Sequence, residues 1–168
     1  MRGSGPVGEA AEGGTPRDPG FKSPRAHTQR FRLDDTLDVR DTAKYLEAIT
    51  PDSPEAKSII GEVYEKRFVE ISCKQGSMDA HIWVYTGPRG DYLLVPRSFC
   101  SCKDFMIRTA STKKTLACKH LIGLELAVKL GKKREVSLSA DECVRVVFEI
   151  LEKNVSPTLR KALYTLQE

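Results

Sequence analysis

The sequence predicts an α+β domain, and three observations lead to that class. Residues 69–95 alternate apolar and polar side chains with a period of two, which is typical of antiparallel strands with one covered face. The segments before and after them carry apolar residues at the three- and four-residue spacing of amphipathic helices. Three of the five cysteines follow the strands closely, at positions 100, 102 and 118. We therefore expect N-terminal helices, a small antiparallel meander, a cysteine-rich element and C-terminal helices, in that order.

Residues 1–32 are rich in Gly, Pro, Ser and Arg and contain few apolar side chains. Such a composition does not offset the entropy lost on ordering, so these residues are expected to form a disordered tail. No apolar run approaches the ~20 residues of a membrane span, and the start lacks the apolar core of a secretory signal. These features favour an intracellular protein, cytoplasmic or (in a eukaryote) nuclear, that does not bind membranes.

Residues 33–66 predict a helical segment made of two short helices. The first presents one apolar side, formed by Tyr45, Leu46 and Ile49. A Thr-Pro-Asp break follows, and a Ser-Pro pair at residue 53 opens the second helix with an N-cap and a proline at the first helical position. The second helix carries a core-facing stripe at helical spacing, formed by Ala56, Ile59, Ile60, Val63 and Tyr64.

Residues 67–134 are expected to hold the meander and the cysteine-rich element, whose core spans residues 97–131. Glycine-containing turns separate three strands, which we place at 69–74, 78–85 and 91–95. Cys73 falls on the apolar face of the first strand, and we interpret it as a small core residue, as we do Cys143. An aromatic row on the opposite face could stack nucleic-acid bases but is expected to lie beneath the N-terminal helices; it consists of His81, Trp83 and Tyr85.

Residues 135–168 predict a C-terminal helical segment, preceded by a helix that follows His120 and ends at Gly131. A capping box at residues 139–142 opens the next helix, and a Ser-Pro pair at residue 156 opens the last. The side chains expected to face inward from these two helices are Cys143, Val144, Val147, Phe148 and Leu151, then Leu159, Leu163 and Leu166.

The net charge of +4 is distributed unevenly along the chain. The segment from Arg97 to Arg134 has ten basic and two acidic residues, which gives it a charge of +8 and leaves −4 for the rest. A basic surface of this kind is expected to meet phosphate groups or an acidic partner. A solvated, lysine-rich surface without a partner is an equal alternative on charge alone.

The cysteines of this basic segment have the spacing of a metal site. Cys100 and Cys102 lie two residues apart at the end of the last strand, where alternate side chains share a face. Cys118 and His120 open the following helix, whose free N–H groups favour thiolate over thiol. Three thiolates and one imidazole suit a tetrahedral Zn2+ ion. Because four protein ligands leave no open position, we expect one structural zinc ion and no enzymatic activity.

Three alternatives remain open for these cysteines. A disulfide is disfavoured by the small ring that Cys100 and Cys102 would close and by the reducing compartment expected for the chain. A phosphatase is suggested by the C-x5-R spacing of Cys102 and Arg108, but the bulky residues between them favour a helix over an anion-binding loop. The third alternative is a set of buried, chemically inert cysteines.

The pattern Cys100-Ser-Cys102, then Cys118-Lys-His120 opening an apolar helix, resembles the SWIM zinc finger. The short chain, the preceding strands, Phe105 and the run at 118–127 are similar to the small stand-alone SWIM proteins of Shu-type recombination complexes. The resemblance covers about residues 65–130 and implies a zinc-bound ββα element. It also implies that the chain pairs with a RecA-family recombinase paralogue and promotes recombinational DNA repair.

On this hypothesis the chain is a non-catalytic module that binds DNA without sequence preference, binds a protein partner, or both. The alternative is a protein–protein adaptor that docks a partner through its C-terminal helices and does not bind DNA. The basic residues expected to face phosphate groups are Arg97, Lys103, Arg108, Lys113, Lys114, Lys119, Lys132, Lys133 and Arg134.

Overall fold

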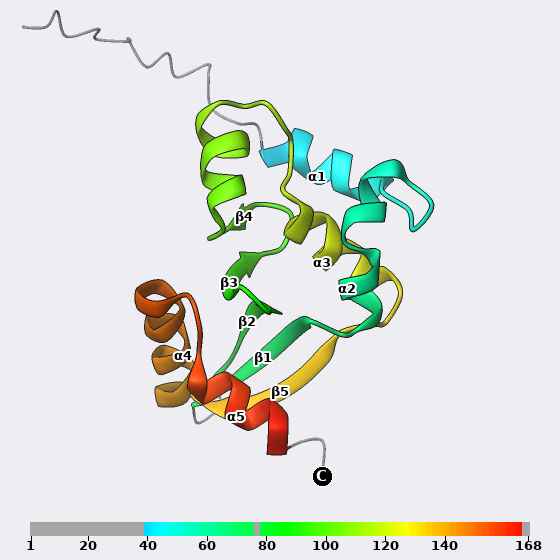
Figure 1. Ribbon diagram of the computed structural model, residues 1–168. Helices are drawn as coiled ribbons and strands as arrows, with labels where there is room; N and C mark the ends of the chain where they lie inside the picture. Colours follow the sequence, from blue (N-terminus) through cyan, green and yellow to red (C-terminus); the bar gives the residue numbers. More distant parts are fainter. Residues whose placement is uncertain (1–38, 76–77, 166–168) are drawn as a thin grey trace, which may run out of the picture. The chain divides into compact units, whose positions relative to one another are not determined.

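A five-stranded sheet organises the domain, with its strands in the order β4-β3-β2-β1-β5 (Figure 1). The computed structural model describes residues 39–75 and 78–165, all within one unit that spans residues 36–168. The expected tail at residues 1–32 and the beginning of the N-terminal helical segment lie outside the described residues. The strands are β1 (Phe68–Gln75), β2 (Met78–Gly87), β3 (Gly90–Val95), β4 (Phe99–Cys100) and β5 (Arg134–Ser139).

The predicted meander is confirmed, because β1, β2 and β3 pair antiparallel in chain order. β5 pairs parallel with β1 and was not predicted, since the segment from residue 135 was expected to be helical. Its Val136 and Leu138 alternate with polar residues as in a strand, but six residues between two helices give a weak local signal. The pairing with β1, more than 60 positions away, decides the conformation of this segment.

Helices lie on both faces of the sheet (Figure 1). The sheet is mostly antiparallel and the helices lie before and after its meander, so the α+β class is confirmed. One face packs against α4 (Ala140–Lys153) and α5 (Pro157–Thr165), over a core around Val69, Ile71 and Val84. A second core surrounds Phe68 and Tyr85, and its helices are α1 (Val39–Ala48), η2 (Pro54–Ser58), α2 (Ile60–Tyr64) and α3 (Lys119–Lys129). None of the helices that the structure describes is long and apolar enough to cross a membrane.

Local sequence signals placed the end of α3 and the starts of α4 and α5 correctly, whereas the helix expected after Ser53 is divided into η2 and α2. Gly131 adopts a positive φ of 63°, which few other residues tolerate, directly after α3 ends. The Ser139 hydroxyl accepts a hydrogen bond from the N–H of Glu142, whose carboxylate accepts one from the Ser139 N–H, so the predicted capping box is present. α5 begins at Pro157, and its Leu159 and Leu163 are buried as expected, whereas Leu166 lies outside the described residues.

The inward face predicted for α4 is wrong in part. Cys143 is buried as expected, but its buried companions are Val146 and Ile150. Val144 and Phe148, which were expected to point inward, are more than half exposed, and so is Leu151. Two apolar stripes with helical spacing share this helix, and periodicity alone does not say which one the sheet covers.

Cys73 and Cys143 form a disulfide that joins β1 to the beginning of α4. Both residues are buried in the core, as predicted, but the sequence analysis did not anticipate the bond between them. Seventy residues separate them, and the pairing follows from the packing of α4 on β1, which the sequence pattern did not reveal. The bond fastens the face of the sheet that α4 and α5 cover.

The disulfide should contribute measurably to stability, because it removes conformational freedom from the unfolded chain. We expect Cys143→Ala to lose about 2–4 kcal/mol of unfolding free energy in urea without reductant. Dithiothreitol should lower the stability of the wild type by a similar amount and leave the variant unchanged. A wild type that is equally stable with and without reductant would contradict the disulfide.

Candidate metal centre

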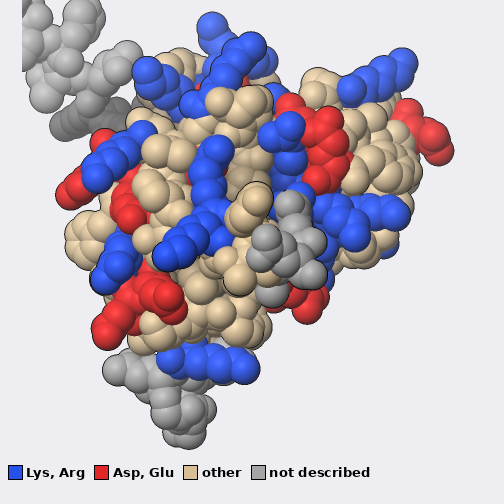
Figure 2. Space-filling model, turned by 60° about the horizontal axis from the view of Figure 1, so that its bottom comes forward, with Lys and Arg blue, Asp and Glu red and all other residues tan. Residues whose placement is uncertain are grey.

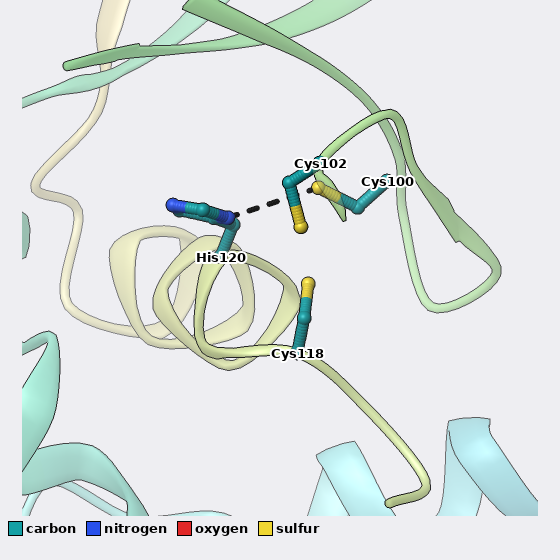
Figure 3. A group of neighbouring side chains, drawn as sticks. All are labelled: Cys100, Cys102, Cys118 and His120. Carbon is teal, nitrogen blue, oxygen red and sulfur yellow. Dashed lines mark hydrogen bonds between the residues drawn. The ribbon is translucent and has the colours of Figure 1, made fainter. Parts of the chain in front are cut away.

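Four metal-ligating side chains converge between β4 and α3 (Figure 3). They are the predicted ligands Cys100, Cys102, Cys118 and His120, and all four are buried. Their donor atoms lie within 4.8 Å of one another. Sulfur and nitrogen ligands of a tetrahedral zinc ion, at ~2.3 and ~2.0 Å from the metal, are about 3.5–3.8 Å apart. The cluster could therefore hold one metal ion after small shifts of its side chains, and the described residues add no fifth ligand to it.

The first pair of ligands is positioned by the edge of the sheet. Cys100 ends β4 and pairs with Leu94 of β3. Ser101, the spacer residue, continues this edge: its N–H donates to the Leu93 carbonyl and its hydroxyl accepts from the Leu93 N–H, both at 3.0 Å. These two bonds fix the chain so that the residues on either side of the serine, Cys100 and Cys102, reach the same centre.

The second pair is positioned by the start of α3. Cys118 is the N-cap residue, and its carbonyl accepts hydrogen bonds from the N–H groups of Leu121 and Ile122 at 3.1 and 3.2 Å. Gly123 lets this helix approach the core closely, because a Cβ there would lie 2.4 Å from Phe68 Cζ. The glycine thereby determines how near the His120 end of α3 comes to the strands.

Aromatic rings hold His120 in place, and these residues were not identified as part of the site from the sequence. The imidazole lies 4.5 Å from the ring of Tyr85 and 4.8 Å from that of Tyr92, and its Nδ1 is 3.9 Å from Cys100 Sγ (Figure 3). The Tyr85 hydroxyl donates to the carboxylate of Glu62 in α2. Such supporting contacts fix the orientation of a metal ligand. The one sequence feature that could have indicated these contacts with His120 was the position of Tyr85 on the polar face of its strand.

Three buried thiols so close together do not ionise independently. The pKa of Cys100 is raised, chiefly by its hydrogen bond with Cys102, while thiol donors from Cys100 and Cys118 lower the pKa of Cys102. For Cys118, the bond with Cys100 lowers the pKa, but the bond with Cys102 and burial outweigh it and raise the value to about 12. Without a cation, therefore, one thiolate is favoured and the other two sulfurs stay protonated, so metal binding must displace protons.

The chain after Cys102 forms a helix, as expected for the metal hypothesis. η3 (Phe105–Ser111) is a π-type helix, and the Phe105 N–H donates to Cys102 Sγ at 3.3 Å. Arg108 pairs with Asp104 on the surface of this helix, with Nη1 3.2 Å from the carboxylate. A C-x5-R phosphatase needs these N–H groups and the arginine to surround an anion, and this arrangement directs them elsewhere.

The nine candidate phosphate contacts do not form one surface. Four of them already have acidic partners: Arg97, Arg108, Lys119 and Lys133. The group at residues 132–134 follows the C-terminal end of α3, whereas the residues near the cysteines lie at its N-terminal end, about 16 Å away along the helix. On the face shown in Figure 2, basic side chains are likewise interspersed with acidic ones.

Residues 103–117, which we call the zinc loop after the metal expected from the sequence, present the basic side chains nearest the cluster. Lys103 and Lys114 are exposed, and the part of the chain that the structure describes offers neither an ion-pair partner. The loop also exposes apolar side chains that the charge pattern did not reveal, namely Met106, Ile107 and Leu116. Its surface is therefore mixed, with separate basic and apolar side chains.

Arg97 forms ion pairs that connect the turn following β3 to α3 and α1. Its guanidinium forms two 2.9 Å hydrogen bonds with the Glu125 carboxylate in α3 and a third bond with Glu47 in α1. Burial raises the pKa of Glu125, but the hydrogen bonds and charge of Arg97, aided by Lys129, outweigh it and leave the pKa below its usual value. A contact between Arg97 and phosphate, as predicted from the sequence, would therefore compete with these bonds to Glu125 and Glu47.

Loss of one of the four candidate ligands should abolish metal binding. We expect the wild type to purify with one metal ion per chain, and Cys118→Ala to purify without it and to lose protection of the α3 amides against hydrogen exchange. Native mass spectrometry and hydrogen exchange measure the two effects. Cys143→Ala, which removes a cysteine outside the cluster, should keep its metal. A wild type that is folded and free of metal would refute the site.

Removal of Arg97 should destabilise the domain, because the Glu125 side chain is only 10% exposed and would lose its main partner. We expect Arg97→Gln to cost about 1–3 kcal/mol at neutral pH, against less than about 0.5 kcal/mol for Arg89→Gln on an exposed turn. The pKa of Glu125 is lowered in the folded state, so this stabilisation is present above the unfolded pKa of about 4.3 and is lost as the pH falls through the folded value. Urea unfolding at several pH values checks both the cost and its disappearance in acid; equal costs for the two variants would contradict the assignment.

No family model, curated protein or solved structure matches this chain. What is known of the site therefore comes from the geometry of Cys100, Cys102, Cys118 and His120 and from the chemistry of these ligands.

Proposed function

We propose that this chain is a SWIM-type zinc protein in which one Zn2+ ion is structural and the module has no enzymatic activity. The observation that carries this proposal is the buried set of three cysteines and one histidine within 4.8 Å. Thiolate and imidazole are the ligands zinc prefers, and a site with four protein ligands has no position left for a substrate or an activated water. The zinc would complete a ββα element built from β3, β4 and α3.

The zinc loop is the part of this module that we propose contacts DNA. Lys103 and Lys114 are exposed, carry no ion pair within the described residues and lie between the two ligand pairs. A metal-fixed loop presents such charges at low entropic cost, and contacts to the phosphate backbone carry no sequence information. We therefore propose sequence-independent DNA binding, with a role in recombinational repair beside a RecA-family recombinase paralogue, as the SWIM resemblance implies.

A second candidate function is a protein–protein adaptor that does not bind DNA. The exposed Met106, Ile107 and Leu116 of the zinc loop favour it, because phosphate contacts make no use of apolar side chains. This surface is closer to the cluster than the C-terminal helices, which the sequence suggested for the adaptor. Both functions are compatible with the same zinc ion, so DNA binding has to be tested directly.

Charge reversal in the loop tests the DNA proposal. We expect Lys103→Glu/Lys114→Glu to weaken binding to labelled single-stranded and duplex DNA and to reduce the slope of log K against log salt by about 2, since each lost phosphate contact contributes about 0.9. Fluorescence anisotropy between about 50 and 200 mM salt measures both quantities. Lys57→Glu/Lys161→Glu is the matched control, because it makes the same change in net charge at exposed lysines outside the loop.

The outcomes separate the two candidates. Wild-type protein that holds zinc but binds neither DNA at physiological salt would refute DNA binding and support the adaptor. Equal weakening by the loop variant and its control would show that net charge, and not the loop, determines binding. Metal content measured on each variant excludes loss of the zinc site as the cause.

A further inference from the structure

Helix α4 has a second apolar face that points away from the sheet. Val144, Phe148 and Leu151 are 55, 59 and 60% exposed, and the half-buried Val147 lies among them. Their spacing of three, one and three residues places all four on one side of the helix. We call these four residues the α4 stripe. It is distinct from Cys143, Val146 and Ile150, which face the sheet.

The described residues leave this stripe uncovered. α5 lies on the other side of α4, where the Glu149 carboxylate accepts hydrogen bonds from the hydroxyl of Ser156 and from Thr158, at 2.6 and 2.9–3.1 Å. Val95 of β3, two residues after the core residue Leu93, is also 51% exposed, whereas its partner in β4, Phe99, packs edge-on against Phe105 with ring centroids 5.5 Å apart. The sheet face that carries α4 thus has exposed apolar side chains on the helix and at the end of β3.

The charges beside the stripe are arranged for self-pairing. Arg145 and Glu152 are seven residues apart, so they lie on the same flank of α4, about 10 Å from each other along the axis. Both are exposed, and neither forms an ion pair within 4 Å with another described residue. The pKa of Glu142, one turn before Arg145, is lowered chiefly by its hydrogen bonds with Ser139, and the charge of Arg145 helps to lower it. If a second α4 lies antiparallel across the stripe, Arg145 of each copy faces Glu152 of the other. A two-fold axis repeats this opposite-charge contact twice.

We propose that the chain forms a homodimer in which two α4 helices pack antiparallel through Val144, Val147, Phe148 and Leu151. The apolar side chains supply the buried core of the contact, and the Arg145–Glu152 pairs at its rim select the antiparallel register. The contact uses the sheet face opposite the N-terminal helices, so it leaves the zinc loop available. It does not depend on whether the chain binds DNA.

Sedimentation velocity over a concentration series tests this dimer. The wild type should reach twice the 18.7 kDa mass of the chain, and Phe148→Glu should remain monomeric at the same concentrations. Arg145→Glu and Glu152→Arg each replace two attractive pairs with two repulsive ones, so each should weaken the dimer about tenfold or more. The double variant Arg145→Glu/Glu152→Arg exchanges the charges and should restore wild-type association. A non-reducing gel excludes dimers linked by cysteine, and metal content with circular dichroism confirms that each variant is folded.

Two results would overturn the proposal. A monomeric wild type at the highest concentration would mean that the stripe does not bind a second copy. Single variants that dissociate while the double variant also stays monomeric would reject the antiparallel pairing of α4. If Arg145 and Glu152 acted only within their own chain, combining the two substitutions would not restore association. Recovery of the dimer in the double variant therefore indicates that the two residues pair between chains.

Discussion

The junction between β4 and α3 depends on a single electrostatic constraint. Three cysteine sulfurs and an imidazole are buried within 4.8 Å of one another, where deprotonated sulfurs repel each other strongly and have little water to solvate them. A cation at their centre converts that repulsion into attraction and replaces the lost solvation. The arrangement is therefore favourable only when protons or a metal ion neutralise it, and a metal ion satisfies all four donors at once.

The effect of this junction reaches well beyond its four ligands, because α3 is the helix on which the second core is built. Residues 120–127 of α3 are all buried, and Gly123 brings the helix into direct contact with Phe68 and Ile59. Lys129 at the other end donates to the carbonyls of Leu46, Glu47 and Ile49 at the end of α1. The same helix thus carries two ligands, fills the core and fastens the N-terminal helices, so disorder at the metal centre would spread to all three.

The sequence was sufficient for the parts of the structure that local chemistry determines. The four ligands follow from their spacing, the meander from its period of two, and the ends of α3 and α4 from Gly131 and Ser139. It was insufficient where packing between distant segments decides. β5 depends on its pairing with β1, and the disulfide depends on the position of α4 over Cys73. The orientation of α4 could not be derived, because both of its apolar stripes have helical spacing. The role of Arg97 was hidden for the same reason, since Glu125 and Glu47 are distant in sequence.

The two faces of the sheet are fastened by links with opposite chemical requirements. The bond between Cys73 and Cys143 resists acid and chelators but is broken by thiols. A metal ion held by the three cysteines and His120 would withstand thiols but would be released by acid or a chelator. Oxidising surroundings preserve the first link and threaten the second, because free thiolates are the groups that oxidants attack. The chain therefore has no single redox condition in which both links are at their most secure, and the surroundings in which it works determine which half of the domain is the more rigid.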